Sequence, residues 1–208
     1  MSKLYLARHG ESVFNLEGRV GGDSELSPKG RNDAEHVAEL LSVLELNTIY
    51  CSTLIRSIQT AEIIQKRFPL TPLVKLDKLK ELNFGIAEGL THLEFERLCP
   101  DLFNQRKKQW YQFKFPDGES YEMVWDRINV FIEELKKFSG NYLVVAHGMV
   151  NKSIIGTLLN LGENLTTISI PHDIIFEIDL NNVLDIKRLT PNGKFKGIEL
   201  IDYGQKSL

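Results

Sequence analysis

The 208-residue sequence predicts an α/β fold: a three-layer α/β/α sandwich with a mainly parallel sheet, an antiparallel edge strand and a small cap. Short apolar runs alternate with longer stretches of helical periodicity, the pattern of a parallel sheet covered by helices. The last two apolar runs instead follow one another across Asn181-Asn182, which predicts a hairpin at a sheet edge. The composition, 42% hydrophobic and 25% charged, is typical of a globular protein.

Each element of the first half has a local cause. Residues 4–7 and 48–51 are short runs of strand-forming side chains. Residues 32–44 repeat apolar side chains every three or four positions, which predicts a helix, and Ser27-Pro28-Lys29-Gly30 before them favours a helix start. The same spacing predicts a helix over residues 54–68, which Pro69 ends.

The alternation resumes after a less regular stretch. Residues 71–116 lack sustained periodicity, and we expect an insertion or cap over the site there. The later elements are a helix over residues 119–138, a strand over 142–146, a helix over 150–161, and the hairpin over 174–180 and 183–189. Because no repeat and no Gly/Ser/Pro-rich linker divides the chain, residues 1–208 are expected to form a single domain.

Charge and composition exclude several functions. A formal net charge of −3 offers no basic face for nucleic acid. No run approaches the roughly 18 apolar residues of a membrane-spanning helix. A signal peptide is not expected, because Arg8 and Glu11 interrupt the apolar start. With Cys51 and Cys99 as the two cysteines, no disulfide framework is implied, and we expect a cytoplasmic protein without nucleic-acid or membrane partners.

Two histidines, His9 and His147, directly follow predicted strands. Because ligands of open α/β sheets bind at the carboxyl ends of the strands, both rings are expected to face one crevice. Gly10 lets the backbone approach a ligand, and Arg8 offers a guanidinium fork for phosphate oxygens. An imidazole with one nitrogen held protonated can accept a phosphoryl group at the other. Taken alone, either histidine is more often a hydrogen-bonded structural residue, and His36 is interpreted as a solvated surface residue.

Five motifs in order change that interpretation. They are Arg8-His9-Gly10-Glu11-Ser12 with Asn15, the run 52–61 with Arg56, Lys80-Glu81-Leu82-Asn83-Phe84-Gly85, Gly118-Glu119-Ser120-Tyr121, and Val144-Val145-Ala146-His147-Gly148. With them the sequence resembles the histidine phosphatase (phosphoglycerate mutase-like) superfamily from about residue 3 to residue 189. The resemblance implies an enzyme that uses neither a metal nor another cofactor. The histidines and carboxylates also show no zinc-like spacing.

The resemblance further implies a role for each motif residue. His9 attacks phosphorus and becomes a phosphohistidine, and Glu81 protonates the leaving group and then activates water. The groups around the phosphoryl oxygens are Arg8, Asn15, Arg56, Gly148 and a protonated His147. On composition alone, Glu81 would be a surface carboxylate, and Arg56 an arginine paired with Glu62.

Within the superfamily the closest resemblance is to the fructose-2,6-bisphosphatase domain, chiefly over residues 18–27 and 111–121. The residues then predicted to bind the rest of the substrate are Gly21, His92, Arg106, Trp110, Tyr121 and Lys152. Arg106 and Tyr121 are of the expected types. His92, Trp110 and Lys152 instead replace a tyrosine, a lysine and an arginine, and Gly148 replaces a glutamine. Trp110 is open to two interpretations, an aromatic anchor of the cap or a substrate contact.

We therefore expect a phosphomonoesterase whose partners are a small phosphorylated metabolite and inorganic phosphate. A sugar phosphate such as fructose 2,6-bisphosphate is the leading substrate. Phosphoglycerate mutase-type transfer and α-ribazole or phosphoserine phosphatase activity remain open alternatives, although the short loop over residues 18–27 favours hydrolysis. A catalytically retired metabolite-binding module is disfavoured, because both histidines, Glu81 and the arginines Arg8 and Arg56 are present.

Overall fold

A seven-stranded sheet forms the centre of the protein, in the order β3-β2-β4-β1-β5-β6-β7. The structure is a computed structural model that describes residues 2–162, 168–190 and 192–197. The strands are β1 (Lys3–Arg8), β2 (Thr48–Ser52), β3 (Leu73–Leu76), β4 (Asn141–Ala146), β5 (Ile175–Asp179), β6 (Asn182–Thr190) and β7 (Gly193–Lys196). The first four run parallel to one another, and β5, β6 and β7 continue the sheet in antiparallel fashion.

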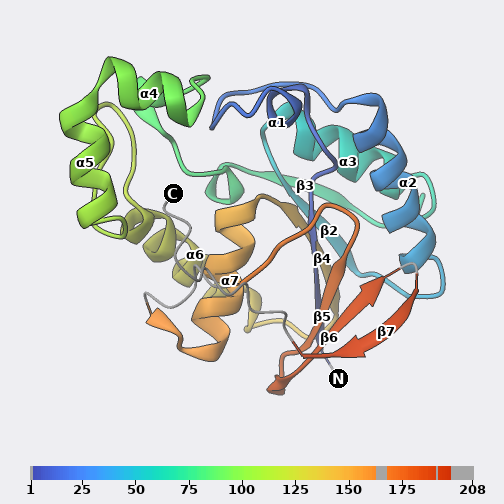
Figure 1. Ribbon diagram of the computed structural model, residues 1–208. Helices are drawn as coiled ribbons and strands as arrows, with labels where there is room; N and C mark the ends of the chain where they lie inside the picture. The colour runs from blue at the N-terminus through green and yellow to red at the C-terminus, as the bar shows by residue number, and fades with distance from the viewer. Residues whose placement is uncertain (1, 163–167, 191, 198–208) are drawn as a thin grey trace.

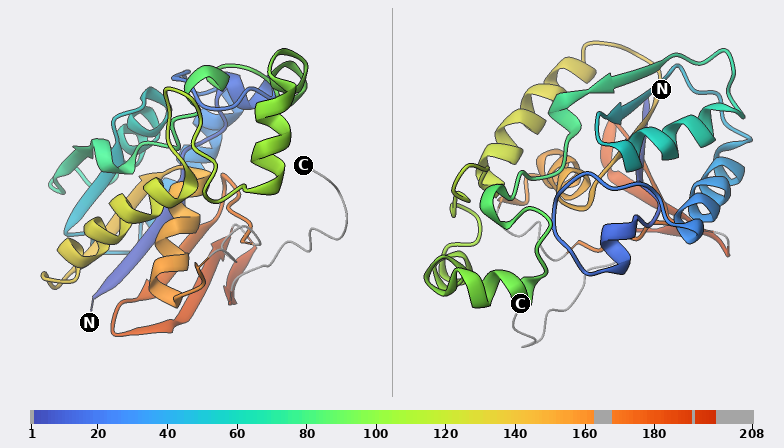
Figure 2. Two further views of the ribbon diagram at one scale, coloured as in Figure 1. Left: turned by 90° about the vertical axis from the view of Figure 1, so that its left-hand side faces the viewer. Right: turned by 90° about the horizontal axis from the view of Figure 1, so that it is seen from above.

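Helices cover both faces of this sheet, so the predicted three-layer sandwich is confirmed (Figure 1). The helices are α1 (Val13–Leu16), α2 (Pro28–Leu41), α3 (Ile55–Gln65), α4 (His92–Leu98), α5 (Pro100–Lys108), α6 (Tyr121–Leu135) and α7 (Gly148–Leu159), with short 3₁₀ turns at Asp77–Leu79 and Gly85–Ala87. Helices α4 and α5 stand at the end of the molecule opposite β6 and β7 (Figure 2). Within the described residues, no helix is long and apolar enough to cross a membrane.

The side chains of β1 alternate between two cores, as the pleat of a strand requires. Leu4 and Leu6 are fully buried in the core that contains the apolar face of α6 and α7. Tyr5 and Ala7 point the other way, into the core under α2 and α3. A strand buried on both faces explains why the sequence shows a continuous apolar run there instead of alternation.

Most predicted elements are confirmed, and the differences have local causes. Helix α2 begins four residues before the predicted start, because Ser27 caps it by accepting a hydrogen bond from the Gly30 N–H at 3.0 Å and Pro28 occupies its first turn. The prediction of a less regular stretch from residue 71 is wrong for residues 73–76, which pair with β2 as the strand β3. The rest of that stretch contains α4 and α5. The C-terminal hairpin is confirmed as β5 and β6, and β7 extends it.

The register between β1 and β4 positions the site. These strands are parallel neighbours with Arg8 opposite Ala146. The residues that follow, His9 and His147, therefore leave the sheet at the same edge.

Candidate active site

His9 and His147 lie side by side in the interior, as the sequence predicts. Their ring centroids are 4.9 Å apart, and the residues are 2% and 0% exposed. The His9 N–H donates to the Ala146 carbonyl at 2.9 Å, which continues the β1–β4 pairing by one residue. The backbone at His9 is thus held by the sheet itself.

The hydrogen bonds of His9 define its protonation. Its Nδ1 lies 2.7 Å from the Gly10 carbonyl oxygen, which can only accept, so Nδ1 carries the proton. Nε2 then presents a lone pair, and Arg56 Nε donates to it at 3.2 Å. Burial, together with His147, Arg56 and Arg8, lowers the pKa of His9 well below its ordinary value. The ring is therefore neutral at pH 7, with Nε2 as the available nucleophile.

His147 is oriented by a buried hydroxyl. Ser52 Oγ lies 2.7 Å from His147 Nε2 and accepts the Leu54 N–H at 3.1 Å. If the Ser52 hydroxyl donates to Nε2, the proton of the neutral ring lies on Nδ1, a buried atom with no partner among the described residues. The opposite arrangement would leave both the hydroxyl hydrogen and Nδ1 unsatisfied, so we assign the proton to Nδ1. His147 then offers one N–H donor to a ligand.

The protonated His147 that the resemblance implies beside a phosphoryl group stays a prediction, and the free protein favours the neutral ring. Burial first, and then the charges of Arg56 and Arg8, lower its pKa well below the ordinary value. The ring is therefore neutral at pH 7. It acts as a hydrogen-bond donor without adding a third charge beside the two guanidinium groups.

Two guanidinium groups supply the positive charge. Arg56, from the first turn of α3, is 4% exposed and donates to the Gly22 carbonyl at 2.7 Å. Arg8 donates to the Ile170 carbonyl at 3.1 Å, while its buried Nε has no partner in the described part of the chain. Burial lowers the pKa of both arginines, and the Glu81 carboxylate opposes this effect at each of them. Both stay charged, since arginine is not deprotonated in proteins.

Glu81 stands over the first turn of α7. Its carboxylate accepts the Met149 N–H at 3.2 Å and the Leu82 N–H at 3.1 Å. Gly148 leaves space beside it, because a Cβ there would lie 3.7 Å from Glu81 Oε2 and 3.8 Å from Arg8 Cζ. The carboxylate therefore faces a volume that a larger residue at position 148 would fill.

Asn15 forms a capping box with Ser12 at the start of α1. Its amide oxygen accepts from the Ser12 N–H at 3.0 Å and from the Ser12 hydroxyl at 3.1 Å. The side chain lines the pocket beside His9. Since the oxygen is used in the cap, the amide NH₂ is the group that Asn15 can offer to a phosphate oxygen.

The glycine-rich loop over residues 18–27 closes the site on one side. Gly21 and Gly22 both have φ of +61°, a conformation that glycine adopts without strain. The Gly22 N–H donates to Glu88, and the Val20 N–H donates to the Leu90 carbonyl at 2.9 Å. Asp23 accepts the Ile55 N–H at 2.7 Å, which ties the loop to the first turn of α3.

Three pockets meet at Glu81, and each of them is also lined by Arg8, by Arg56 or by both. The pocket at His9 has a volume of about 160 Å³ and is lined by Arg8, His9, Ser12, Asn15, Arg19, Val20, Gly21, Arg56, Glu81 and Phe84. A second, of about 500 Å³, is lined by Arg8, Glu81, Gly148, Met149, Lys152 and residues 168–171. A third, of about 320 Å³, lies beside Arg56 and Glu81 and includes Gly21, Lys80 and Asn83.

The predicted substrate residues fall into two groups. Gly21 and Lys152 line pockets that meet at the site. His92 and Arg106 are outside the lining of these pockets. Burial lowers the pKa of His92, and the charge of Arg106 lowers it further. The Arg106 guanidinium lies 5.8 Å from the ring centroid of Phe115. Trp110 contacts Tyr121, with ring centroids 5.2 Å apart. These contacts agree with the interpretation of Trp110 as an aromatic anchor, and its contact with substrate stays a prediction.

Sequence reasoning missed three residues that touch the site. Ser52 and Thr60 lie within the Arg56 motif, but no role follows from the motif pattern itself. Ser52 contacts His147, and Thr60 Oγ1 accepts the Gly10 N–H at 3.0 Å. His172 is 2.5 Å from the His9 carbonyl oxygen through its Nδ1. No local sequence signal could have found His172, because its approach to His9 depends on the antiparallel pairing of β5 with β1.

Comparison with known proteins agrees with this geometry. Residues 4–174 match the Histidine phosphatase superfamily (branch 1). The chain therefore belongs to the histidine phosphatase superfamily.

The chain is also similar in sequence to several named proteins. The chain is 35% identical over 159 residues to 6-phosphofructo-2-kinase/fructose-2,6-bisphosphatase 4 of Rattus norvegicus, covering 76% of this chain and 33% of the relative. It is 34% identical over 182 residues to the fructose-2,6-bisphosphatase of Saccharomyces cerevisiae, covering 85% of this chain and 38% of the relative. The chain thus spans about a third of the length of these relatives. The α-ribazole phosphatase of Shigella flexneri has the same fold, with a TM-score of 0.82, 21% identity, and coverage of 95% and 96% of the two chains.

We predict that the protein gains stability as pH rises from about 5 to 7, in part through His172. Burial and the charge of Arg8 lower the pKa of His172 to about 4 in the folded protein, against roughly 6.5 when unfolded. Between these values the unfolded chain binds more protons, so the free energy of unfolding increases with pH. Urea unfolding of His172→Asn should show a smaller increase than the wild type, by about 1 to 2 kcal/mol.

His36→Asn is the matched control, because His36 is exposed on α2. It should keep the wild-type pH dependence. The same increase in the wild type and in His172→Asn would contradict the assignment of a neutral, half-buried His172.

Proposed function

We propose that this chain is a phosphomonoesterase that transfers a phosphoryl group from a small metabolite to His9 Nε2 and then to water. One observation carries the proposal: the unprotonated Nε2 lies among buried donors that lack partners. Arg8 Nε and His147 Nδ1 have no hydrogen-bond partner in the described chain, and Arg56 Nε already points at Nε2. A tetrahedral phosphoryl group next to Nε2 would satisfy these donors with its oxygens.

In the first step the Nε2 lone pair attacks phosphorus, an N–P bond forms, and the bond from phosphorus to the leaving oxygen breaks. Glu81 enters this step protonated, and the leaving oxygen takes that proton. The ring becomes positively charged, and its Nδ1–H remains hydrogen-bonded to the Gly10 carbonyl, which stabilises that charge. Arg8, Arg56 and His147 bind the charge on the three remaining oxygens.

In the second step water replaces the leaving group. The Glu81 carboxylate takes a proton from the attacking water, the N–P bond breaks, and inorganic phosphate leaves. Glu81 is then protonated and His9 is neutral again, so the cycle closes without another reactant. The two backbone N–H groups that donate to Glu81 hold its carboxyl group in place for both proton transfers.

The substrate that we propose is a sugar phosphate, and fructose 2,6-bisphosphate is the most specific candidate. The names of the relatives at 34–36% identity support this choice. The pocket of about 500 Å³ beyond Arg8 and Glu81 offers room for the rest of the molecule, and Lys152 on its wall supplies a cation. A lysine gives a point charge in place of the bidentate contact of an arginine, so a second phosphate would be bound less tightly. A cytoplasmic location stays a prediction.

We expect the wild type to hydrolyse p-nitrophenyl phosphate in the presence of EDTA, and His9→Ala to lose at least about a thousandfold in kcat/KM, because the covalent route needs the imidazole. Among the described residues, no cluster of three or more His, Cys, Asp or Glu side chains is arranged to hold a metal ion. Wild-type turnover no higher than that of His9→Ala would contradict the enzymatic function. Loss of turnover on addition of EDTA would contradict the metal-free mechanism.

Glu81→Gln tests the proton donor. An alkoxide leaving group needs a proton, whereas nitrophenolate hardly does, so the variant should lose about 10² to 10⁴ in kcat for an alkyl phosphate and much less for p-nitrophenyl phosphate. Steady-state rates on both substrates measure the difference. Equal losses on the two would show that Glu81 does not act as the acid.

Trp110→Lys tests whether Trp110 contacts the substrate. If Trp110 contacts the substrate, a lysine there should raise kcat/KM for fructose 2,6-bisphosphate relative to fructose 6-phosphate by about tenfold, through one added ion pair with the second phosphate. The panel should include 3-phosphoglycerate, phosphoserine and α-ribazole phosphate. An unchanged ratio would assign Trp110 to packing against Tyr121 alone.

A further inference from the structure

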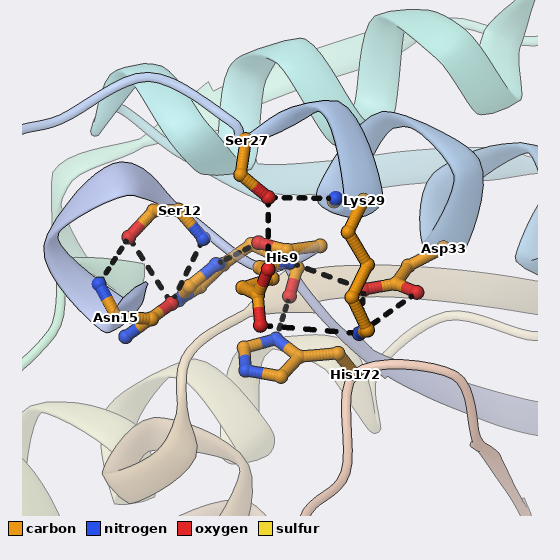
Figure 3. A network of polar contacts seen from close by, with 10 residues as sticks. His9, Ser12, Asn15, Ser27, Lys29, Asp33 and His172 are labelled. Atoms are coloured by element: carbon orange, nitrogen blue, oxygen red, sulfur yellow. Dashed lines mark hydrogen bonds and ion pairs between the residues drawn. The ribbon is translucent and has the colours of Figure 1, made fainter. Parts of the chain in front are cut away.

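The peptide bond between His9 and Gly10 is held at both ends by side chains. Its carbonyl oxygen lies 2.5 Å from His172 Nδ1 (Figure 3). Its N–H donates to Thr60 Oγ1 at 3.0 Å. Because a carbonyl oxygen can only accept, His172 Nδ1 must be the donor. Thr60 comes from α3 and His172 from the segment before β5, so elements far apart in the chain fix one peptide plane.

This plane bears directly on the nucleophile. The His9 ring is oriented by its hydrogen bond to the Gly10 carbonyl, which belongs to the next peptide. Gly10 has no side chain to restrict its backbone, so rotation about its bonds would move that carbonyl and the ring with it. Clamping the preceding peptide removes part of this freedom. The following N–H, that of Glu11, donates to Asp33 at 3.3 Å, so both peptides around Gly10 are tied to side chains.

The environment of His172 keeps it a neutral donor. The groups that act on it are Arg8, Lys29, Asp33 and the His9 carbonyl, and burial together with Arg8 lowers its pKa to about 4. Its ring also meets the His9 ring edge-on, with centroids 5.3 Å apart. A charged donor here would lower the nucleophilicity of His9 further, whereas a neutral imidazole supplies the hydrogen bond without that effect.

We propose that His172 is a positioning residue for the phosphoryl transfer, which holds the His9–Gly10 peptide so that His9 Nε2 faces the phosphorus. This inference rests on the proposed role of His9 as nucleophile. A misplacement of about 1 Å can reduce a reaction rate by about a hundredfold, so the lost hydrogen bond should be visible in the rate of phosphorylation.

The test compares His172→Asn with His172→Asp, which have nearly the same shape. The Asn amide can donate to the His9 carbonyl in place of Nδ1–H, whereas an Asp carboxylate cannot. With p-nitrophenyl phosphate, His172→Asp and His172→Ala should lose about 10- to 100-fold in the rate of phosphohistidine formation, measured by rapid quench, with KM little changed. His172→Asn should stay within about fivefold of the wild type, and His36→Asn should match it.

Melting temperatures of all variants separate positioning from folding. Wild-type phosphorylation rates in His172→Ala would overturn the proposal. Equal losses of phosphorylation rate in the Asn and Asp variants would also overturn it, because the rate would then not depend on whether the side chain can donate a hydrogen bond. Absence of turnover in the wild type would instead overturn the proposed function itself, and the two failures are thus distinguishable.

Discussion

The parallel pairing of β1 with β4 is the constraint on which the site depends. With Arg8 opposite Ala146, the two strands end at the same level of the sheet. The His9 N–H continues their pairing with a hydrogen bond to the Ala146 carbonyl. A shift of one residue would turn each buried side chain to the other face and separate His9 from His147. The side chains of both strands are packed in two separate cores, so that shift would disrupt the packing of each core. The stability of the sheet and the geometry of the site therefore have the same origin.

The electrostatics of the site follow from burial. Arg8 and Arg56 bring two charges into a region where His9 and His147 are kept neutral by desolvation and by the same two charges. Glu81 partly balances them, and the protein as a whole carries a net charge of −3. An excess of buried donors over acceptors is costly in the free protein. An anion that accepts from these donors removes that cost, so the arrangement favours the binding of an anion.

Much of this arrangement is predictable from local sequence, and the exceptions share a cause. His9 and His147 each follow a strand, so their convergence follows from the rule that parallel strands end at one edge. The contact of His172 with His9 requires the antiparallel register that places Ala7 opposite Ile175, and no local pattern specifies a pairing between such distant segments. Strand β3 is missed for a related reason: its side chains are mostly half-buried and Lys75 is exposed, so its pattern is weak. The neutrality of His147 depends on burial that the chain acquires only when folded.

The backbone around Gly10 is closely packed against the first turn of α2, which requires glycine and leaves the orientation of the His9 ring to side-chain contacts. A Cβ on Gly10 would lie 2.0 Å from the Gly30 carbonyl oxygen, and a Cβ on Gly30 would lie 1.9 Å from the Glu11 carbonyl oxygen. The loop after β1 and the first turn of α2 thus approach too closely for any residue but glycine at these two positions. Glycine permits this approach and at the same time gives the loop conformational freedom.

Each of the three imidazoles at the site is held by an oxygen atom at one ring nitrogen, and this limits the freedom that the glycines introduce. His9 is held by the Gly10 carbonyl, His147 by the Ser52 hydroxyl and His172 by the His9 carbonyl. In His9 the other ring nitrogen, Nε2, carries a lone pair. In His147 the other ring nitrogen, Nδ1, is an N–H donor. Attack on phosphorus needs the first, and binding of its oxygens needs the second. The different roles of two chemically identical rings therefore arise from whether the neighbouring oxygen accepts or donates.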